Sequence, residues 1–251
     1  MPDELVARRA GFAPVKGTRH LALEAVGLDE QGARGDRSFC LVDVAGARVL
    51  KTVQHPSLVG VVARVDGDEL GLTLPSGESV VAPAARSGQT ITCDYWGRAV
   101  DLDLVEGPHA ELLADWLGRE VAVAAAPRGG VVFGDPLTVL GTASLLELAR
   151  RTGHEELPAQ AGRFRATLVV ETDEPHVEDT WAGREVALGG AVVQVGGPVP
   201  RCAVIDHHPE TGVKDVRLLT SLVRDRPTNR AGEPMFGVYA RCVAPGRVVV
   251  S

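Results

Sequence analysis

The chain has 251 residues, of which 45% are hydrophobic, and this content supports a packed core and excludes global disorder. Acidic residues outnumber basic residues by 33 to 26, so the net charge is −7, which argues against the basic face of a nucleic-acid scaffold. No run approaches the roughly 18 apolar residues of a membrane-spanning helix, and residues 1–12 show no targeting pattern. We therefore expect a cytoplasmic protein with no nucleic-acid partner and no membrane partner.

The first hundred residues predict a β-rich region. Two strand pairs are indicated, at 39–44 with 48–50 and at 59–65 with 70–74. The Asp-Gly-Asp sequence at 66–68, between the second pair, is typical of a hairpin turn. Leucines alternate along 70–74, which indicates a strand with one buried face. A short helix is expected at 109–117, because its apolar residues form one stripe and Gly118 is a stop signal.

The second half follows an irregular stretch at 124–134, whose glycines and proline suggest a junction. Ser144 and Glu147 fit a capping box, in which both side chains satisfy free N–H groups at a helix start. Four strands and one further helix are expected, the strands at 165–170, 185–188, 192–195 and 236–242 and the helix at 216–223. Residues 248–250 are expected to close the same sheet.

The four cysteines indicate neither a metal cluster nor a disulfide framework. Cys40, Cys93, Cys202 and Cys242 form no CxxC pair and are sparse for a chain of this length. At least three are expected in the core, where a thiol behaves as a small apolar group. Cys202 stands apart, because Arg201 precedes it and the Gly-Gly-Pro sequence at 196–198 suggests a loop entering a site. An ordinary buried thiol is the alternative for Cys202.

Six short motifs occur in order along the chain. They are Pro14-Val15-Lys16, Gly35-Asp36-Arg37, Arg163-Phe164-Arg165, Glu178-Asp179-Thr180-Trp181, Pro200-Arg201-Cys202 and Phe236-Gly237-Val238-Tyr239. In this order they resemble the MOSC family, the domain named after the C-terminal part of molybdenum cofactor sulfurase, and within it the branch of amidoxime-reducing molybdenum enzymes. The resemblance covers about residues 13–250 and departs from the family pattern at Thr167, at Val199 and at 206–208.

The resemblance implies a β-rich α+β fold. We expect an N-terminal MOSC-N-like β domain at 1–105, followed at 106–251 by a MOSC domain built on a β-barrel with a few short helices. A cofactor would then lie in the cleft between the two domains, which is a common place for a buried ligand.

The resemblance also implies a molybdenum cofactor, a molybdopterin in either mononucleotide or dinucleotide form, with Cys202 as the protein ligand to the metal. A soft metal favours a thiolate, and the adjacent Arg201 favours the deprotonated sulfur. Cations would bind the cofactor phosphate, because guanidinium and ammonium groups match it in charge. The candidates are Lys16, Arg37, Arg163 and Arg165, with the hydroxyls of Ser144 and Thr167 as further contacts.

Each of these residues has a structural alternative. A single arginine or lysine is more often a surface residue or half of a salt bridge, and Ser144 serves equally well as a helix cap. Asp179 is either an acid near a substrate funnel or part of a turn anchored by Trp181. His207 and His208 invite a metal site, but adjacent residues on an extended chain point to opposite sides.

The function implied by the resemblance is a molybdenum-dependent reductase of small N-hydroxylated compounds, such as amidoximes, hydroxylamines and N-oxides. Electrons would come from a separate reductase or ferredoxin-type protein, because the chain has no cluster-type cysteines and no GxGxxG motif. The alternative is a sulfur carrier or cofactor-delivery protein that uses Cys202 as a persulfide or as an anchor. Pyridoxal-phosphate chemistry would need a separate donor protein. A barrel that has lost its cofactor is a third possibility.

Overall fold

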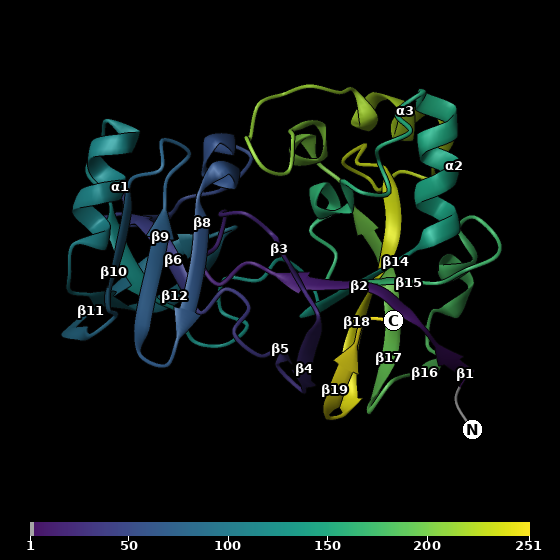
Figure 1. Ribbon diagram of the computed structural model, residues 1–251, viewed down its shortest axis with the longest axis horizontal. Helices are drawn as coiled ribbons and strands as arrows, with labels where there is room; N and C mark the ends of the chain where they lie inside the picture. The colour runs from purple at the N-terminus through teal and green to yellow at the C-terminus, as the bar shows by residue number, and fades with distance from the viewer. Residues whose placement is uncertain (1–2) are drawn as a thin grey trace.

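The computed structural model describes residues 3–251, which form two lobes (Figure 1). The barrel lobe comprises 39–125 and lies on the left of Figure 1. The sheet lobe comprises 3–33 and 137–249 and lies on the right. Strands dominate both lobes, so the expected β-rich α+β class is confirmed. No helix among residues 3–251 is long and apolar enough to cross a membrane.

The barrel lobe combines a closed barrel, a small sheet and one helix. The barrel strands are β6 (Phe39–Asp43), β7 (Arg48–Val49), β11 (Arg86–Tyr95), β12 (Arg98–Val105) and β13 (Ala122–Ala125). The small sheet consists of β8 (Val62–Asp66), β9 (Glu69–Thr73) and β10 (Ser79–Pro83). The helix α1 spans His109–Leu117 and ends at Gly118, as expected. The predicted hairpin is β8–β9, although Val59 and Gly60 belong to a 3₁₀ turn before it.

The sheet lobe is built on an eight-stranded sheet. In spatial order its strands are β1 (Asp3–Leu5), β16 (Glu185–Leu188), β17 (Ala191–Pro200), β18 (Met235–Ala244), β14 (Leu137–Gly141), β15 (Leu168–Val170), β2 (Ala7–Phe12) and β3 (Leu21–Leu23). A smaller sheet holds β19 (Gly246–Val249), β4 (Ala25–Asp29) and β5 (Gly32–Ala33). Two helices, α2 (Thr142–Thr152) and α3 (Leu218–Asp225), lie at one end of this lobe (Figure 1).

The first strands of the chain are part of the sheet lobe. Strand β1 pairs in parallel with β16, and β2 pairs antiparallel with β15. Strand β4 pairs with β19, near the other end of the sequence. The chain therefore passes from the sheet lobe to the barrel lobe and back, and residues 13–20 and 34–38 lie on the first crossings. A domain border at 105/106 stays a prediction.

Three local expectations were wrong. The helix α2 begins at Thr142 with Gly141 as its N-cap, and Ser144 makes no capping bond because its hydroxyl is bound to a buried carboxylate. Residues 196–198 lie inside β17, whose pairing with β18 shifts register around Pro198, since proline cannot donate to the ladder. Strand β19 pairs with β4 instead of closing the main sheet.

Candidate functional site

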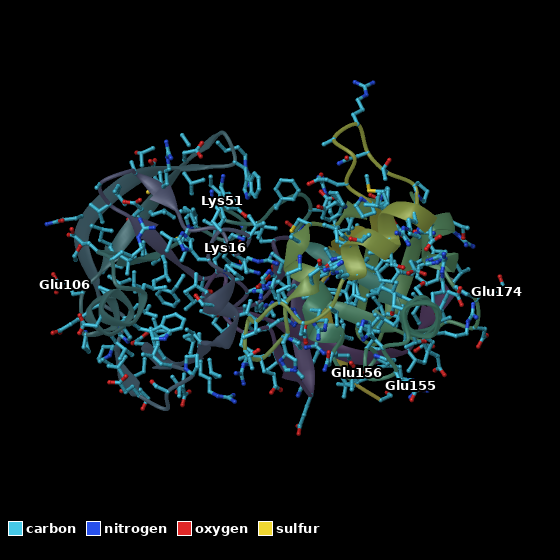
Figure 2. The ribbon with its side chains drawn as sticks, turned by 90° about the horizontal axis from the view of Figure 1, so that it is seen from above. Lys16, Lys51, Glu106, Glu155, Glu156 and Glu174 are labelled. Atoms are coloured by element: carbon cyan, nitrogen blue, oxygen red, sulfur yellow. The ribbon has the colours of Figure 1, made fainter. Side chains whose placement is uncertain are left out.

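A cavity of about 370 Å³ lies where the two lobes meet. The barrel lobe and the crossing segments contribute Lys16, Arg37, Lys51, Thr52, Val53, Tyr95 and Trp96. Segments that follow the barrel strands in the chain contribute Phe133, Arg163, Phe164, Arg165, Pro200, Arg201, Cys202, Val204, Ile205 and Glu233. Figure 2 shows Lys16 and Lys51 on the inner side of the barrel lobe, facing the sheet lobe. The cavity therefore gathers six of the candidate residues from motifs far apart in the sequence.

Cys202 is the accessible thiol of this cavity. It lies two residues after the end of β17 and is exposed, as the N-cap of the 3₁₀ turn Ala203–Asp206. The other three cysteines are buried in the two lobes, as expected. Burial raises the pKa of the Cys40 thiol to about 12. A ligand that enters the cavity thus meets one sulfur atom, and that sulfur belongs to Cys202.

Arg201 fixes the chain beside that thiol from a buried position. Its Nε donates to the Phe236 carbonyl at 2.7 Å, and its Nη1 donates to the Phe164 carbonyl at 2.7 Å. Its Nη2 is buried without a protein partner. Burial lowers the pKa of Arg201 to about 10. Arg201 therefore holds β17, β18 and the 163–165 segment together and retains one unused donor.

The glycine of the Phe-Gly-Val-Tyr motif lies beside the Arg201 guanidinium, and steric constraints explain why it is a glycine. Gly237 has φ of 75°, in the left-handed region that favours glycine. A Cβ atom at this position would lie 2.8 Å from the Val139 carbonyl oxygen and 3.2 Å from Arg201 Nη2. The glycine thus makes room for the buried guanidinium.

Three cations form a second part of the cavity wall. Burial, followed by the charges of Arg37 and Arg165, lowers the pKa of Lys16 to about 7. Burial, followed by the charge of Arg37, lowers the pKa of Arg165 to about 10. Arg37 has one ion-pair partner, Asp36, at 2.9 Å. This group carries more positive charge than its surroundings neutralise, which is the electrostatic condition for an anion-binding site.

Two of these cations, Arg37 and Arg165, have an uncommon backbone conformation, and the Arg165 side chain also connects two segments of the chain. Arg37 and Arg165 have φ of 48° and 51°, values uncommon for residues with a side chain. Arg165 Nη1 donates to the Thr18 carbonyl at 2.8 Å, which links the sheet lobe to the first crossing segment. Strained arginines that converge on a cavity are a reason to infer binding there.

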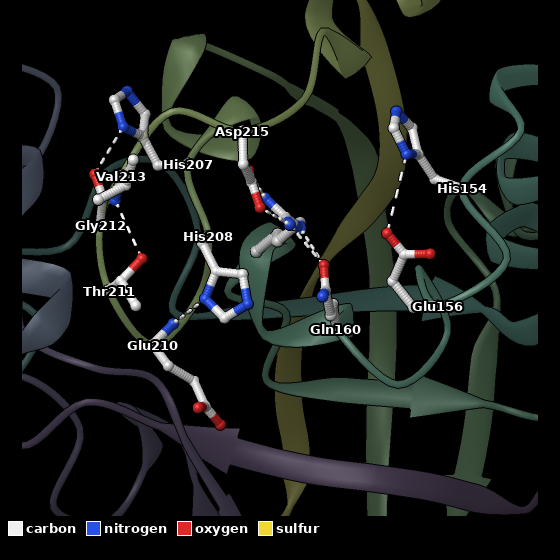
Figure 3. Close-up of polar contacts among 11 residues, drawn as sticks. His154, Glu156, Gln160, His207, His208, Glu210, Thr211, Gly212, Val213 and Asp215 are labelled. Carbon is white, nitrogen blue, oxygen red and sulfur yellow. Dashed lines mark hydrogen bonds and ion pairs between the residues drawn. The ribbon is translucent and has the colours of Figure 1, made fainter.

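Arg163 differs from its neighbour Arg165. Its guanidinium donates to both carboxylate oxygens of Asp215, at 2.8 and 2.7 Å, and its Nε donates to Gln160 at 2.8 Å. Its two partners, Gln160 and Asp215, are labelled in Figure 3. The pair holds the pKa of Asp215 below its usual range. The side chain of Arg163 therefore anchors the loop after Cys202, and its charge is already neutralised.

Three candidate residues lie outside the cavity wall. The Ser144 hydroxyl donates to the buried Glu178 carboxylate at 2.7 Å and accepts from the His176 backbone at 2.8 Å. The Thr167 hydroxyl accepts from the Thr138 backbone at 3.2 Å. Asp179 forms an ion pair with Arg226, within the turn that buries Trp181. The two hydroxyls and one Asp179 oxygen bind other protein groups, the second Asp179 oxygen, Oδ1, is buried without a partner, and none of the three side chains lines the cavity.

The two adjacent histidines also have separate structural partners. His207 Nδ1 lies 2.8 Å from the Gly212 carbonyl oxygen, and His208 Nδ1 accepts from the Glu210 backbone at 3.2 Å. Figure 3 shows their rings pointing apart. Within residues 3–251 there is no group of three His, Cys, Asp or Glu side chains placed to hold a metal ion. A metal in the cavity would therefore depend on Cys202 and on a bound cofactor for its ligands.

Sequence reasoning missed the aromatic part of the cavity. Tyr95 lies beneath Lys16, whose Nζ is 5.2 Å from the ring centroid. Trp96 and Phe133 contact each other, with centroids 5.4 Å apart. Trp96-Gly97 is a turn signal at a hairpin tip, but no sequence pattern connects it with Phe133.

Comparison with known families agrees with this geometry. The MOSC domain model matches residues 114–251. The chain belongs to the MOSC domain family. A second model, the MOSC N-terminal beta barrel domain, matches residues 12–120 and so includes the barrel strands. The expected family and its N-terminal barrel are both confirmed.

Curated relatives of this MOSC protein are longer chains. A molybdenum cofactor sulfurase of Drosophila grimshawi is 26% identical over 242 residues, which cover 90% of this chain and 30% of the relative. A molybdenum cofactor sulfurase of Anopheles gambiae is 28% identical over 265 residues, which cover 90% of this chain and 33% of the relative. The chain thus spans about a third of the length of these relatives. The YUAD protein from Bacillus subtilis aligns over 98% of this chain and 91% of its own, with a TM-score of 0.45 and 12% identity.

Proposed function

We propose that this protein binds a molybdenum cofactor between its lobes and reduces small N-hydroxylated compounds there. The observation that carries the proposal is the exposed Cys202 thiol in one cavity with the under-neutralised cations Lys16, Arg37 and Arg165. Relatives named molybdenum cofactor sulfurase support the cofactor class. Membership in the amidoxime-reducing branch remains part of the proposal.

The residues present fit such a cofactor. A molybdopterin carries a phosphate, and Lys16, Arg37 and Arg165 supply cations at a place with little competing negative charge. An anion beside Lys16 raises the pKa of its amine, because the charged form gains an opposite charge. A phosphate in the cavity would therefore make direct contacts with the three cations and reduce the repulsion among them.

The other wall would hold the metal end. Cys202 would supply the sulfur ligand that a soft metal favours. The spare Nη2 donor of Arg201 is suited to an oxygen or sulfur acceptor of a ligand. When bound, the cofactor supplies two-electron reduction with removal of oxygen from nitrogen. The protein groups bind and orient substrate, and the apolar side chains of Val204 and Ile205 restrict water.

Electrons would reach this site from a separate protein. The described cysteines are three buried thiols and Cys202, and none forms a cluster-type set. We therefore propose a reductase or ferredoxin-type partner.

Sulfur transfer is a second candidate function, favoured by the sulfurase names of the relatives and by the exposure of Cys202. A persulfide on Cys202 would need a donor that supplies sulfane sulfur, after which the sulfur passes to an acceptor and the thiol returns. Persulfide labelling of protein purified without reductant tests this candidate at Cys202.

The test of the main proposal is molybdenum analysis, combined with fluorescence of the oxidised pterin. Wild type and Cys202→Ala are expressed in a host that makes the cofactor, with Cys242→Ala as a control because that thiol lies in the sheet core. We expect near-stoichiometric metal and pterin in wild type and in the control, and loss of metal in Cys202→Ala. Wild type without metal and pterin would refute the reductase.

A further inference from the structure

Two aromatic side chains stand half-exposed at the mouth of the cavity. Trp96 and Phe133 are 48% and 49% exposed, and their ring centroids lie 5.4 Å apart with an angle of 58° between the ring planes. The chain has only three tryptophans, two tyrosines and five phenylalanines. Among residues 3–251 these two are the exposed aromatic side chains, and they lie together. Paired exposed aromatics in a cavity wall are typical of a ligand contact surface.

The backbone at Trp96 supports a functional reading. Strands β11 and β12 pair Tyr95 with Arg98, which leaves Trp96 and Gly97 as a two-residue hairpin loop. Both have positive φ, 55° and 77°, the pattern of a type I′ turn. Asparagine or glycine adopts this backbone readily, whereas a bulky side chain is disfavoured there. A tryptophan at this disfavoured position, with its side chain on the cavity wall, points to a role for the ring.

The two aromatics are fixed relative to each other. Arg98 Nη2 donates to the Val132 carbonyl at 2.6 Å, which ties the segment carrying Phe133 to the hairpin. Lys51 Nζ lies 4.0 Å from the Trp96 ring centroid, a cation–π contact. The mouth therefore presents two aromatic rings and one ammonium group in a preorganised arrangement.

The charge of the cavity defines the class of ligand. Six lysines and arginines line it, of which Arg163 is paired with Asp215 and Arg37 with Asp36, and Glu233 is the one carboxylate among the described lining residues. In the described part of the chain, Lys51 has no carboxylate within salt-bridge distance. A ligand that suits the mouth therefore combines a flat aromatic ring with an anionic substituent.

We propose that Trp96, Phe133 and Lys51 form a subsite for anionic aryl compounds, with the ring packed on the two aromatics and the anion paired with Lys51. The inference deepens the proposed function and rests on it for the reaction: the N-hydroxylated substrate would be an aryl compound with a carboxylate or sulfonate group. Binding at the subsite needs no electron transfer.

Three probes of matched size test the subsite by calorimetry. They are 2-naphthoate, its saturated analogue decahydro-2-naphthoate, and the neutral 2-naphthamide. Wild-type protein as purified should bind 2-naphthoate about tenfold more tightly than either of the other two, because each lacks one recognised feature. Equal affinity for the aromatic and the saturated acid would overturn the proposal.

Variants locate the binding. Trp96→Asn removes the ring and places a residue that favours the turn, so it should fold normally and lower 2-naphthoate affinity about fivefold to tenfold. Lys51→Gln should abolish the preference for 2-naphthoate over 2-naphthamide. Lys214→Gln is the charge control, since Lys214 pairs with Asp206 and lies outside the cavity wall. Unchanged 2-naphthoate binding in Trp96→Asn would place the probe elsewhere and refute the subsite.

The outcomes separate this inference from the proposed function. Naphthoate preference that depends on Trp96, in protein that never acquires molybdenum, would refute the reductase and leave the subsite standing. Molybdenum-dependent reduction with no aryl preference in wild type would support the reductase and refute the subsite.

Discussion

Substitution of Gly237 tests how tightly the site is built around Arg201. An alanine there faces two separate penalties. The positive φ of 75° costs about 1 kcal/mol or slightly more for an alanine. The new Cβ would also lie 2.8 Å from the Val139 oxygen and 3.2 Å from Arg201 Nη2, and overpacking of this kind costs about 1–3 kcal/mol. We therefore expect Gly237→Ala to lower the free energy of unfolding by about 2–4 kcal/mol.

Gly67 provides the matched control. It has φ of 57° in the β8–β9 hairpin, and a Cβ there would meet nothing within 4 Å. Gly67→Ala therefore carries the backbone penalty alone, about 1 kcal/mol. Urea unfolding of both variants at neutral pH measures the difference. If both variants lose the same stability, the packing of Gly237 against the Arg201 guanidinium does not limit substitution and the steric argument fails.

Three further predictions concern other parts of the molecule. Alkylation of the native protein with iodoacetamide should modify Cys202 alone, because the other thiols are buried and their pKa values are raised; labelling of a second cysteine before unfolding would contradict this. The pKa of Lys16 falls from 10.5 to about 7 on folding, so between pH 7 and 10.5 the unfolded chain binds more protons than the folded chain, and the free energy of unfolding rises with pH. Lys16→Met should flatten this rise, measured as the urea midpoint at each pH. An unchanged dependence of the midpoint on pH would refute the prediction. Asp215→Asn should lower the free energy of unfolding by about 2 kcal/mol in the same assay, because it leaves the fully buried Arg163 side chain without its counter-charge. A change near zero would contradict this, because it would mean that the Arg163 charge is solvated.

Local pattern predicted much of the fold. The α1 boundaries and the β8–β9 hairpin follow from short-range periodicity and turn residues, and both are confirmed. The pairing of β2 with β15 joins segments separated by most of the chain, and alternation within a strand does not identify its partner. For the same reason, 248–250 was assigned to the wrong sheet.

The candidate site, like the fold, was predicted only in part from the sequence. The motif order gathered Lys16, Arg37, Arg165 and Cys202, and the structure places all four on one cavity. Motif membership did not distinguish Arg163, whose guanidinium is neutralised by a residue 52 positions away. The roles of the Ser144 and Thr167 hydroxyls were equally hidden, because Ser144 binds the Glu178 carboxylate and Thr167 binds the Thr138 backbone, groups that only the fold brings close. These site assignments remain predictions until ligand binding is measured.

The path of the chain between the lobes has a consequence for biosynthesis. Strands β1, β2 and β4 are made early, yet their partners β16, β15 and β19 are made much later. During synthesis the barrel lobe, which is a continuous stretch of chain, has its partner strands early, whereas β1, β2 and β4 each have one strand edge that waits for a later partner. The wall that carries Cys202 forms only when the sheet lobe closes. If the protein binds the proposed cofactor, loading would therefore follow synthesis of β18 and β19, and the early strands β1, β2 and β4 are the ones most in need of protection from aggregation.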